Sequence, residues 1–319
     1  MARQNTINPP GTRCQRLLMA FLLLVSVTSA SATECGEVRF TDPGWTDIGA
    51  TNGVVTTLLE GLGYKTTITL LGVPIGFESL KNGEIDIFMG NWMPAQQKFI
   101  DKYGNDIDII KTNLEGAKFT LAVPTYAYQA GVTDFADLAA HSKQFDHKIY
   151  GIEPGAPANQ KLQTMIDQGD FGLKGWKVVE SGEQAMLSQV SRTVKRDKYI
   201  VFLAWEPHPM NVNYDIRYLT GGDKYFGPNL GGATVYTVTR KGFSQECPNV
   251  GNLLNNLQFS LTMENEIIGA VLNDGKKPAD AASTWLASHP SVLDAWLQNI
   301  KTIDGKPGLA AVKNHLGIH

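Results

Sequence analysis

The chain has 319 residues, of which 43% are hydrophobic and 18% are charged, and it contains 32 glycines. This length and composition allow a sizeable core in two domains or one large one, and they exclude a disordered or collagen-like chain. The formal net charge of −3 excludes a strongly basic protein, so we expect no nucleic-acid partner.

The first 32 residues have the features of a secretory signal peptide. Arginines precede an almost wholly apolar run at 17–28, and small residues at 30–32 form a cleavage site. The run is too short to span a bilayer, and Cys35 lies too far from the small residues for a lipid anchor. We predict cleavage before Thr33 and a periplasmic protein without a membrane anchor. An uncleaved signal that anchors the protein is the alternative.

Cys35 and Cys247 are the two cysteines that remain after cleavage. An even number of cysteines in an oxidising compartment predicts a disulfide. Neither cysteine belongs to a C-x-x-C pair or has His or Cys nearby at ligand spacing, so we predict no metal site and no redox pair. The bridge would join the mature N-terminus to a late segment of the chain.

The mature chain alternates strand-like runs with segments of helical period. Runs rich in β-branched and aromatic residues predict strands at 38–40, 67–71, 85–88, 119–123, 148–152, 177–179 and 200–204. Apolar residues at helical spacing predict helices at 51–62, 183–196, 250–261, 264–272, 278–287 and 291–300. This βαβα pattern predicts an α/β fold with mostly parallel sheets flanked by helices.

The predicted disulfide also constrains the division into lobes, because no linker or repeat marks a boundary after residue 33. The two cysteines must meet, so the first lobe contains both ends of the mature chain. We predict lobe 1 at 33–115 and 213–319, and lobe 2 at 116–212. Two strands would then cross between the lobes and form a hinge.

Motifs for nucleotide binding and for serine hydrolases are missing. The chain has neither a P-loop nor a G-x-S-x-G nucleophile elbow. His208 is close to Glu206 in sequence, but its place between two prolines favours a structural hydrogen bond over acid–base chemistry. We therefore predict no catalytic residue and no cofactor.

Three tryptophans, Trp45, Trp92 and Trp205, each lie at or after the C-terminal end of a predicted strand. In open α/β sheets, ligands bind at that edge. Three indoles and Asp47 are the groups needed to hold a quaternary ammonium ion, which has no N–H to donate and is recognised by aromatic faces. Packing is the better interpretation for the remaining tryptophans, Trp176, Trp285 and Trp296.

These residues belong to motifs by which the chain closely resembles a known family. It resembles the periplasmic choline-binding proteins of bacterial ABC importers, within the glycine betaine/choline group of type II substrate-binding proteins. The resemblance covers essentially the whole mature chain. It rests on DPGWTD at 42–47, GNWMP at 90–94, GAKFTLA at 116–122, GIEPG at 151–155, FLAWEPHPM at 202–210 and ECPNVG at 246–251.

The resemblance implies a two-lobed type II periplasmic binding protein fold, and a monomer that delivers its ligand to the transmembrane subunits of an ABC importer. It implies a box of rings between the lobes, with Asp47 opposing the ligand's charge. The residues of this box would be Trp45, Trp92, Phe119 and Trp205.

Two positions depart from the choline-binding pattern. Phe119 stands where the choline binders have Tyr, and Ala156 stands where they have an Asn that contacts the choline hydroxyl. Phe119 still supplies a ring, whereas the side chain of Ala156 cannot form a hydrogen bond. Asp47 favours choline, because a carboxylate-bearing ligand needs donors. Ala156 leaves glycine betaine, carnitine or another methylated onium open.

Two other classes of function are alternatives to this receptor. A secreted choline-ester hydrolase would use the rings to bind the cation, and Glu206 with His208, or Asp47, to act on the ester. The missing nucleophile motif argues against it. A protein that serves only as an interaction scaffold is the third interpretation, and a ligand crevice that closes argues against that one.

Overall fold

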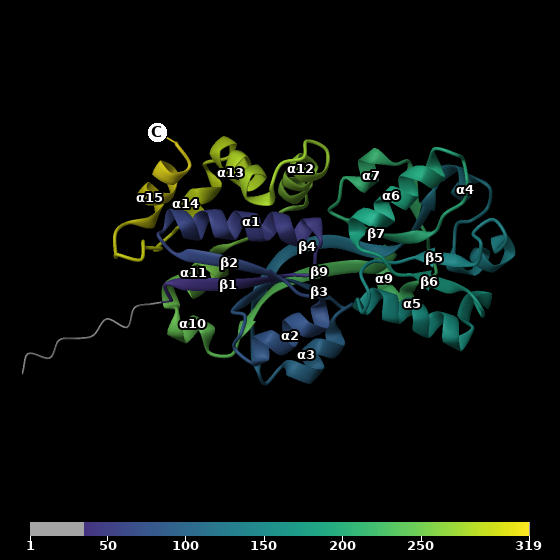
Figure 1. Ribbon diagram of the computed structural model, residues 1–319, viewed down its shortest axis with the longest axis horizontal. Helices are drawn as coiled ribbons and strands as arrows, with labels where there is room; N and C mark the ends of the chain where they lie inside the picture. Colours follow the sequence, from purple (N-terminus) through teal and green to yellow (C-terminus); the bar gives the residue numbers. More distant parts are fainter. Residues whose placement is uncertain (1–34, 319) are drawn as a thin grey trace, which may run out of the picture. The chain divides into compact units, whose positions relative to one another are not determined.

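A computed structural model describes residues 35–318 (Figure 1). The predicted signal peptide at 1–32 and the predicted start at Thr33 lie outside the described residues. In the described part, no helix combines the length and the apolar character needed to cross a membrane.

Nine strands of the described residues form one sheet. They are β1 (Glu37–Asp42), β2 (Lys65–Leu70), β3 (Ile87–Met93), β4 (Ile107–Pro124), β5 (Lys148–Tyr150), β6 (Lys177–Val179), β7 (Phe202–Glu206), β8 (Ile216–Tyr218) and β9 (Gly232–Arg240). Their order is β2-β1-β3-β9-β4-β7-β5-β6, with β8 paired to β4. The pairs β1–β2, β1–β3, β5–β6 and β5–β7 are parallel, whereas every pair formed by β4 and β9 is antiparallel. The sheet is therefore mixed, with parallel strands on both sides of two long antiparallel ones.

Helices cover both faces of this sheet. They are α1 (Thr46–Gly61), α2 (Val73–Lys81), α3 (Gln97–Tyr103), α4 (Thr125–Gln129), η1 (Phe135–His141), α5 (Pro157–Gln168), η2 (Asp170–Gly172), α6 (Glu183–Val194), α7 (Met210–Asn213), α8 (Asp223–Phe226), α9 (Pro228–Gly231), α10 (Phe243–Glu246), α11 (Pro248–Asn256), α12 (Leu261–Leu272), α13 (Pro278–Ser288), α14 (Val292–Trp296) and α15 (Gly308–His315). In Figure 1, α1 and α13 lie on one side of β1–β3, and α2 and α3 lie on the other. These layers confirm the predicted α/β class.

α1 begins five residues earlier than the sequence predicts. Its buried apolar positions start at Ile48 and include Val54 and Leu58. The first turns also bury polar side chains, among them Asp47 and Asn52. Apolar periodicity could not detect these turns, because it reads a buried polar residue as an exposed one.

The predicted helix at 250–261 is wrong at its end, because the chain forms two helices there. α11 ends at Asn256 and α12 begins at Leu261. Between them, the N–H of Phe259 donates to the carbonyl of Asn113 at 2.8 Å. The Ser260 hydroxyl then accepts from the N–H of Met263 at 3.2 Å and starts α12 as its N-cap.

β4 connects the two ends of the sheet. It pairs with β9 up to Lys118 and with β7 from Lys118 onward. Between Leu114 and Ala117, two residues of β4 face one residue of β9, and Gly116 in this bulge has φ +78°. β8, which follows the predicted boundary at 212, pairs with 122–124, the part of β4 beyond the bulge.

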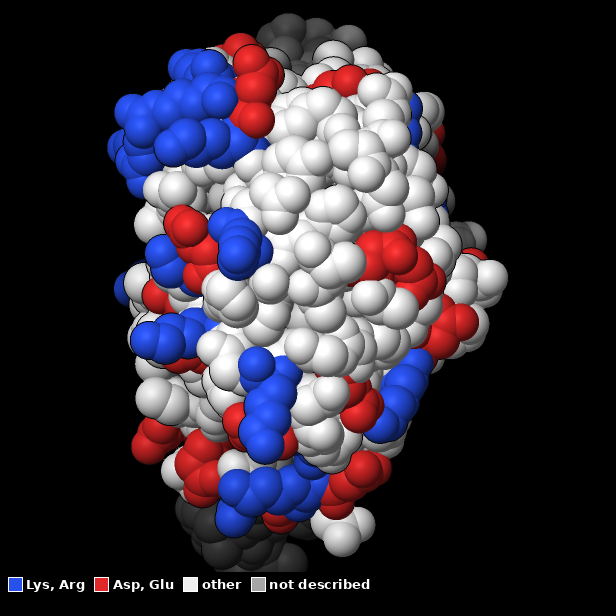
Figure 2. Space-filling view, turned by 90° about the vertical axis from the view of Figure 1, so that its right-hand side faces the viewer, with Lys and Arg blue, Asp and Glu red and all other residues white. Residues whose placement is uncertain are grey.

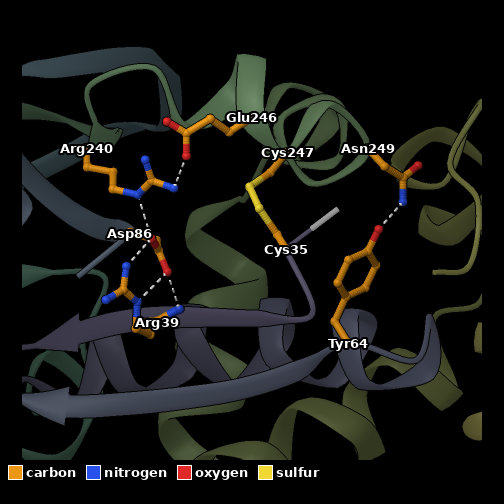
Figure 3. The surroundings of a disulfide bond; sticks show 8 residues. All are labelled: Cys35, Arg39, Tyr64, Asp86, Arg240, Glu246, Cys247 and Asn249. Atoms are coloured by element: carbon orange, nitrogen blue, oxygen red, sulfur yellow. Dashed lines mark hydrogen bonds and ion pairs between the residues drawn. A yellow bond between two sulfur atoms is a disulfide. The ribbon is translucent and has the colours of Figure 1, made fainter. Parts of the chain in front are cut away.

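The predicted disulfide is confirmed. Cys35 and Cys247 are bonded with their Cα atoms 5.7 Å apart, a separation typical of disulfides. Figure 3 shows a second link beside it, in which Asp86 lies between Arg39 and Arg240. The disulfide thus joins the segment before β1 to the segment after β9, and the ion pairs through Asp86 join β1 to the end of β9.

Candidate functional site

One cavity brings together five of the predicted ligand residues. The empty space within it, including the part open to solvent, is about 410 Å³. Trp45, Asp47, Trp92, Phe119 and Trp205 line it, although they come from four separate parts of the chain. The other lining residues are Ala95, Gln96, Ile152, Pro157 and Ala158.

A tight turn after β1 presents Trp45 and Asp47 to the cavity. Gly44 has φ +90°, a conformation that favours glycine, and its N–H donates to Oδ1 of Asp42 at 2.7 Å. α1 starts directly after the turn, with Asp47 in its first turn. The positive end of the helix dipole therefore lies beside this carboxylate.

The other three rings come from strands. Trp92 is near the end of β3, and Phe119 lies directly opposite Trp205 in the antiparallel pair of β4 and β7. Directly opposed residues project on one face of a sheet, so these two rings are neighbours. The ring centroids of Trp92 and Phe119 are 6.2 Å apart, and Phe226 packs edge-on against Phe119 at 5.7 Å. The strand pairing and this packing hold the three rings of Trp92, Phe119 and Trp205 side by side.

Asp47 is buried without a cationic partner. Nε1 of Trp92 donates to its Oδ2 at 3.2 Å, while its Oδ1 has no hydrogen-bond partner among the described residues. The pKa of Asp47 lies well above its ordinary value, first because burial disfavours the charged form and then because Glu183 is negative. A cation on the ligand would therefore stabilise the ionised form of the Asp47 carboxyl group.

The cavity differs in charge from the outer surface. Figure 2 shows basic and acidic side chains interspersed on one face, with a basic cluster at one corner. In the cavity, Asp47 is the single ionisable side chain among the described lining residues. When Asp47 is ionised, the field inside is therefore negative and favours a cation.

Two glutamates from later parts of the chain hold the turn around Trp45. Glu183, the first residue of α6, accepts from the N–H of Thr46 at 2.8 Å and also from the Thr46 hydroxyl. Oε2 of Glu153 accepts from Nε1 of Trp45 at 2.7 Å. Burial raises the pKa of Glu153 to about 7, although the hydrogen bond from Trp45 acts in the opposite direction. These contacts join α1 to segments 108 and 137 residues away.

His208 has structural partners on both ring nitrogens. Its Nδ1 accepts from the N–H of Met210 at 2.9 Å, so the proton of the neutral ring is on Nε2, which lies 3.2 Å from Oε1 of Glu183. The ring also meets Trp205 edge-on, with centroids 5.0 Å apart. His208 supports the wall of the cavity and does not line it.

A family model describes most of this chain. The model, named OpuAC and described as the substrate binding domain of ABC-type glycine betaine transport system, matches residues 36–288. The chain belongs to this family. Its members are substrate-binding proteins of transporters, which are not enzymes, and they act with the membrane subunits of ABC importers in the periplasm or outside the cell.

Solved structures of OpuAC-like proteins share the fold. An ABC-transporter choline-binding protein in complex with choline is 53% identical, covers 89% of this chain and 99% of its own, and has a TM-score of 0.87. The unliganded, semi-closed form of such a protein gives 0.82 at the same identity and coverage. Lactococcal OpuAC, closed on glycine betaine, is 28% identical over 82% of this chain and 98% of its own, with a TM-score of 0.74. These neighbours are type II periplasmic binding proteins.

Two curated proteins are similar over about half of the chain. An uncharacterized protein of Chromohalobacter salexigens, ORF1, is 43% identical over 46% of this chain and 96% of its own length. The glycine betaine/carnitine transport binding protein GbuC of Listeria monocytogenes is 26% identical over 51% of this chain and 53% of its own. None of these comparisons supports the choline-ester hydrolase alternative.

Ala156 is the predicted ligand residue that the structure does not bring to the cavity of this OpuAC family member. It is buried and precedes α5, while its neighbours Pro157 and Ala158 line the wall. The sequence also missed Gln96 as a lining residue. The signal for it was weak, because Gln96 lies in a loop after Trp92 and its amide contacts depend on how that loop folds.

Proposed function

We propose that the protein binds choline in the periplasm and delivers it, as a monomer, to the transmembrane subunits of an ABC importer. The observation that carries the proposal is the buried carboxyl group of Asp47, which has no cationic partner in residues 35–318 and lies among Trp45, Trp92, Phe119 and Trp205. A trimethylammonium group cannot donate a hydrogen bond, so ring faces and a carboxylate are the groups that attract it. Each desolvated ring contributes about 2 kcal/mol.

The charge of the cavity favours choline over glycine betaine and carnitine. A ligand carboxylate needs Arg, Lys or other donors, and the described lining has no basic side chain. Next to Asp47, a second carboxylate would repel the first. The similarity to the choline complex, at 53% identity, supports the same choice.

We further propose that ligand binding closes two lobes around the cavity. β4 would provide one crossing strand, and the second crossing would follow β8, because β8 pairs with the far part of β4. The bonds from Thr46 to Glu183 and from Trp45 to Glu153 would form on closure. Small-angle scattering should show a smaller radius of gyration when choline is added. Identical profiles at saturation would contradict closure.

Calorimetric titration of aromatic variants tests the binding site. Trp92→Ala or Trp205→Ala should weaken choline binding by about 1 to 3 kcal/mol. Trp285→Ala is the matched control, because this ring lies on α13, outside the cavity, and stacks on His289. If Trp92→Ala and Trp205→Ala remain folded and bind choline as tightly as wild type, the ring box is refuted.

A ligand panel tests the choice of choline. If wild-type protein binds glycine betaine or carnitine at least about tenfold tighter than choline, a difference of ~1.4 kcal/mol, choline is the wrong ligand and the ring box remains. Choline recovered unchanged after denaturation of the complex would support a receptor over the hydrolase.

A further inference from the structure

Gln96 places a buried amide in the wall of the cavity. Its backbone N–H donates to the carbonyl of Trp92 at 2.9 Å, which holds it in the turn that leads from β3 to α3. The side chain is buried and lines the cavity. Gln96 is therefore fixed beside one of the four rings.

The orientation of this amide follows from its one hydrogen bond. Nε2 donates to the carbonyl of Gly90 at 2.8 Å. A carbonyl oxygen only accepts, so the nitrogen of the amide must face it. Oε1 is left buried, with no hydrogen-bond partner in the described part of the protein.

An unsatisfied buried acceptor in a binding cavity points to a donor on the ligand. Leaving such a group without a partner costs free energy, whereas a ligand O–H would satisfy it. The unpartnered oxygens of Asp47 and Gln96 are both acceptors, and a carboxylate ligand brings more acceptors. An alcohol brings one donor.

We propose that Gln96 is a specificity residue whose Oε1 accepts the hydroxyl hydrogen of the ligand. The inference rests on the proposed function and narrows the ligand class to quaternary ammonium alcohols. It assigns to Gln96 the recognition of the hydroxyl, because Ala156 has no suitable side chain and does not line the cavity. The rings and Asp47 hold the cationic end, and Gln96 selects the other end.

The test compares choline with two analogues that keep the cation. Ethyltrimethylammonium lacks the hydroxyl, and the methyl ether of choline keeps the oxygen but cannot donate. We expect wild-type protein to bind choline about 3- to 10-fold tighter than either analogue, the equivalent of one hydrogen bond. In Gln96→Met the ratio of the choline affinity to that of either analogue should fall to about one, while the affinity for ethyltrimethylammonium is retained.

Gln97→Met is the matched control, because the adjacent glutamine is exposed and its side chain bonds to Asp101 at 2.7 Å. It should keep the full preference for choline. Wild-type protein that binds choline and ethyltrimethylammonium equally overturns the inference without any variant. So does an unchanged preference in Gln96→Met, or an equal loss of all three ligands in it.

The same panel separates this inference from the proposed function. Wild-type protein that binds none of the three onium ligands would overturn both. Binding of all three with equal affinity would overturn the role of Gln96 and leave the ring box supported.

Discussion

Two buried aspartates, Asp86 and Asp47, lie in opposite electrostatic surroundings. Asp86 is 3% exposed and accepts hydrogen bonds from Arg39 and Arg240 (Figure 3). Burial alone would raise the pKa of Asp86, but the bonds from Arg39 and then Arg240 outweigh it and lower this pKa. Asp47 is equally buried, forms no ion pair among the described residues and has a raised pKa.

The contrast separates a structural carboxylate from a binding one. A buried charge is tolerated when the protein supplies its counter-charge, and Asp86 has two. For Asp47 the protein supplies the backbone N–H of Ile48, the indole N–H of Trp92 and more negative charge, from Glu183 and Asp42. A cationic ligand can therefore supply the counter-charge that Asp47 lacks, and this pairing contributes to the free energy of binding.

The largest effect is expected when Asp86 loses its charge. Asp86→Asn should lower the free energy of unfolding by about 2 to 4 kcal/mol, since it leaves Arg39 and Arg240 without their carboxylate. The estimate is below the range for fully buried pairs, because the side chain of Arg39 is 37% exposed. Urea unfolding measures the change, and choline affinity should stay the same. Unaltered stability would mean that the two arginines do not depend on Asp86.

Asp47→Asn should weaken choline binding without lowering stability, the opposite of Asp86→Asn. Choline binding should weaken by about 2 to 4 kcal/mol, because the cation loses its counter-charge in a desolvated site. The stability of the unliganded protein should stay equal or rise, since Asn is neutral without having to take up a proton and can still accept from Trp92. Calorimetry and urea unfolding on both variants give the comparison directly. A stability loss as large as that of Asp86→Asn would contradict the separation of roles.

The sequence could predict the binding residues but not the partners of Asp86. Trp45, Trp92 and Asp47 could be predicted, because aromatic type and position at strand ends carry the signal. Arg39 and Arg240 could not be paired with Asp86, because strand order brings them together across more than half of the chain. β9 itself was missed, since its threonines and glycine hide the apolar alternation.

The site shows the same limit. Whether Gln96 keeps a free acceptor depends on which atom accepts the hydrogen bond from its amide nitrogen. Whether Ala156 lines the cavity depends on the direction of this one residue before α5. Both are properties of the folded loop. Sequence motifs place such residues near the ligand, but a difference of one residue decides whether a side chain lines the cavity.

Choline affinity should rise with pH. The raised pKa of Asp47 means that the folded, unliganded protein holds a proton that the unfolded chain has already lost. Its stability therefore falls as pH increases from the ordinary value of 3.8 to the raised one. Choline favours the ionised form, so binding releases this proton and strengthens by up to about tenfold per pH unit in that window.

The titration should cover about pH 5 to 8, since burial also raises the pKa of Asp42 to about 6 and that of Glu153 to about 7. Calorimetry in buffers of different ionisation enthalpy counts the protons released. Asp47→Asn should show a flatter profile. Constant affinity without proton release would show that Asp47 is already ionised in the unliganded protein.

The smallest effect is expected at Glu264, a third carboxyl group that refines the comparison. It is buried on α12, and no hydrogen bond or ion pair of its carboxyl is found among the described residues. Its pKa is raised well above its ordinary value, first by burial and then by the negative charge of Asp47. It does not line the cavity, so no ligand atom can supply its counter-charge.

Glu264 should therefore remain protonated where Asp47 becomes ionised. Gln is nearly isosteric with a neutral Glu, so Glu264→Gln should change choline affinity at neutral pH by no more than about twofold, or ~0.4 kcal/mol. Its stability should stay within about 1 kcal/mol of wild type. Because Glu264 is still neutral when Asp47 ionises, the rise of choline affinity with pH should keep its position in this variant. An affinity loss matching that of Asp47→Asn would show that Glu264 is ionised and holds part of the ligand's charge itself.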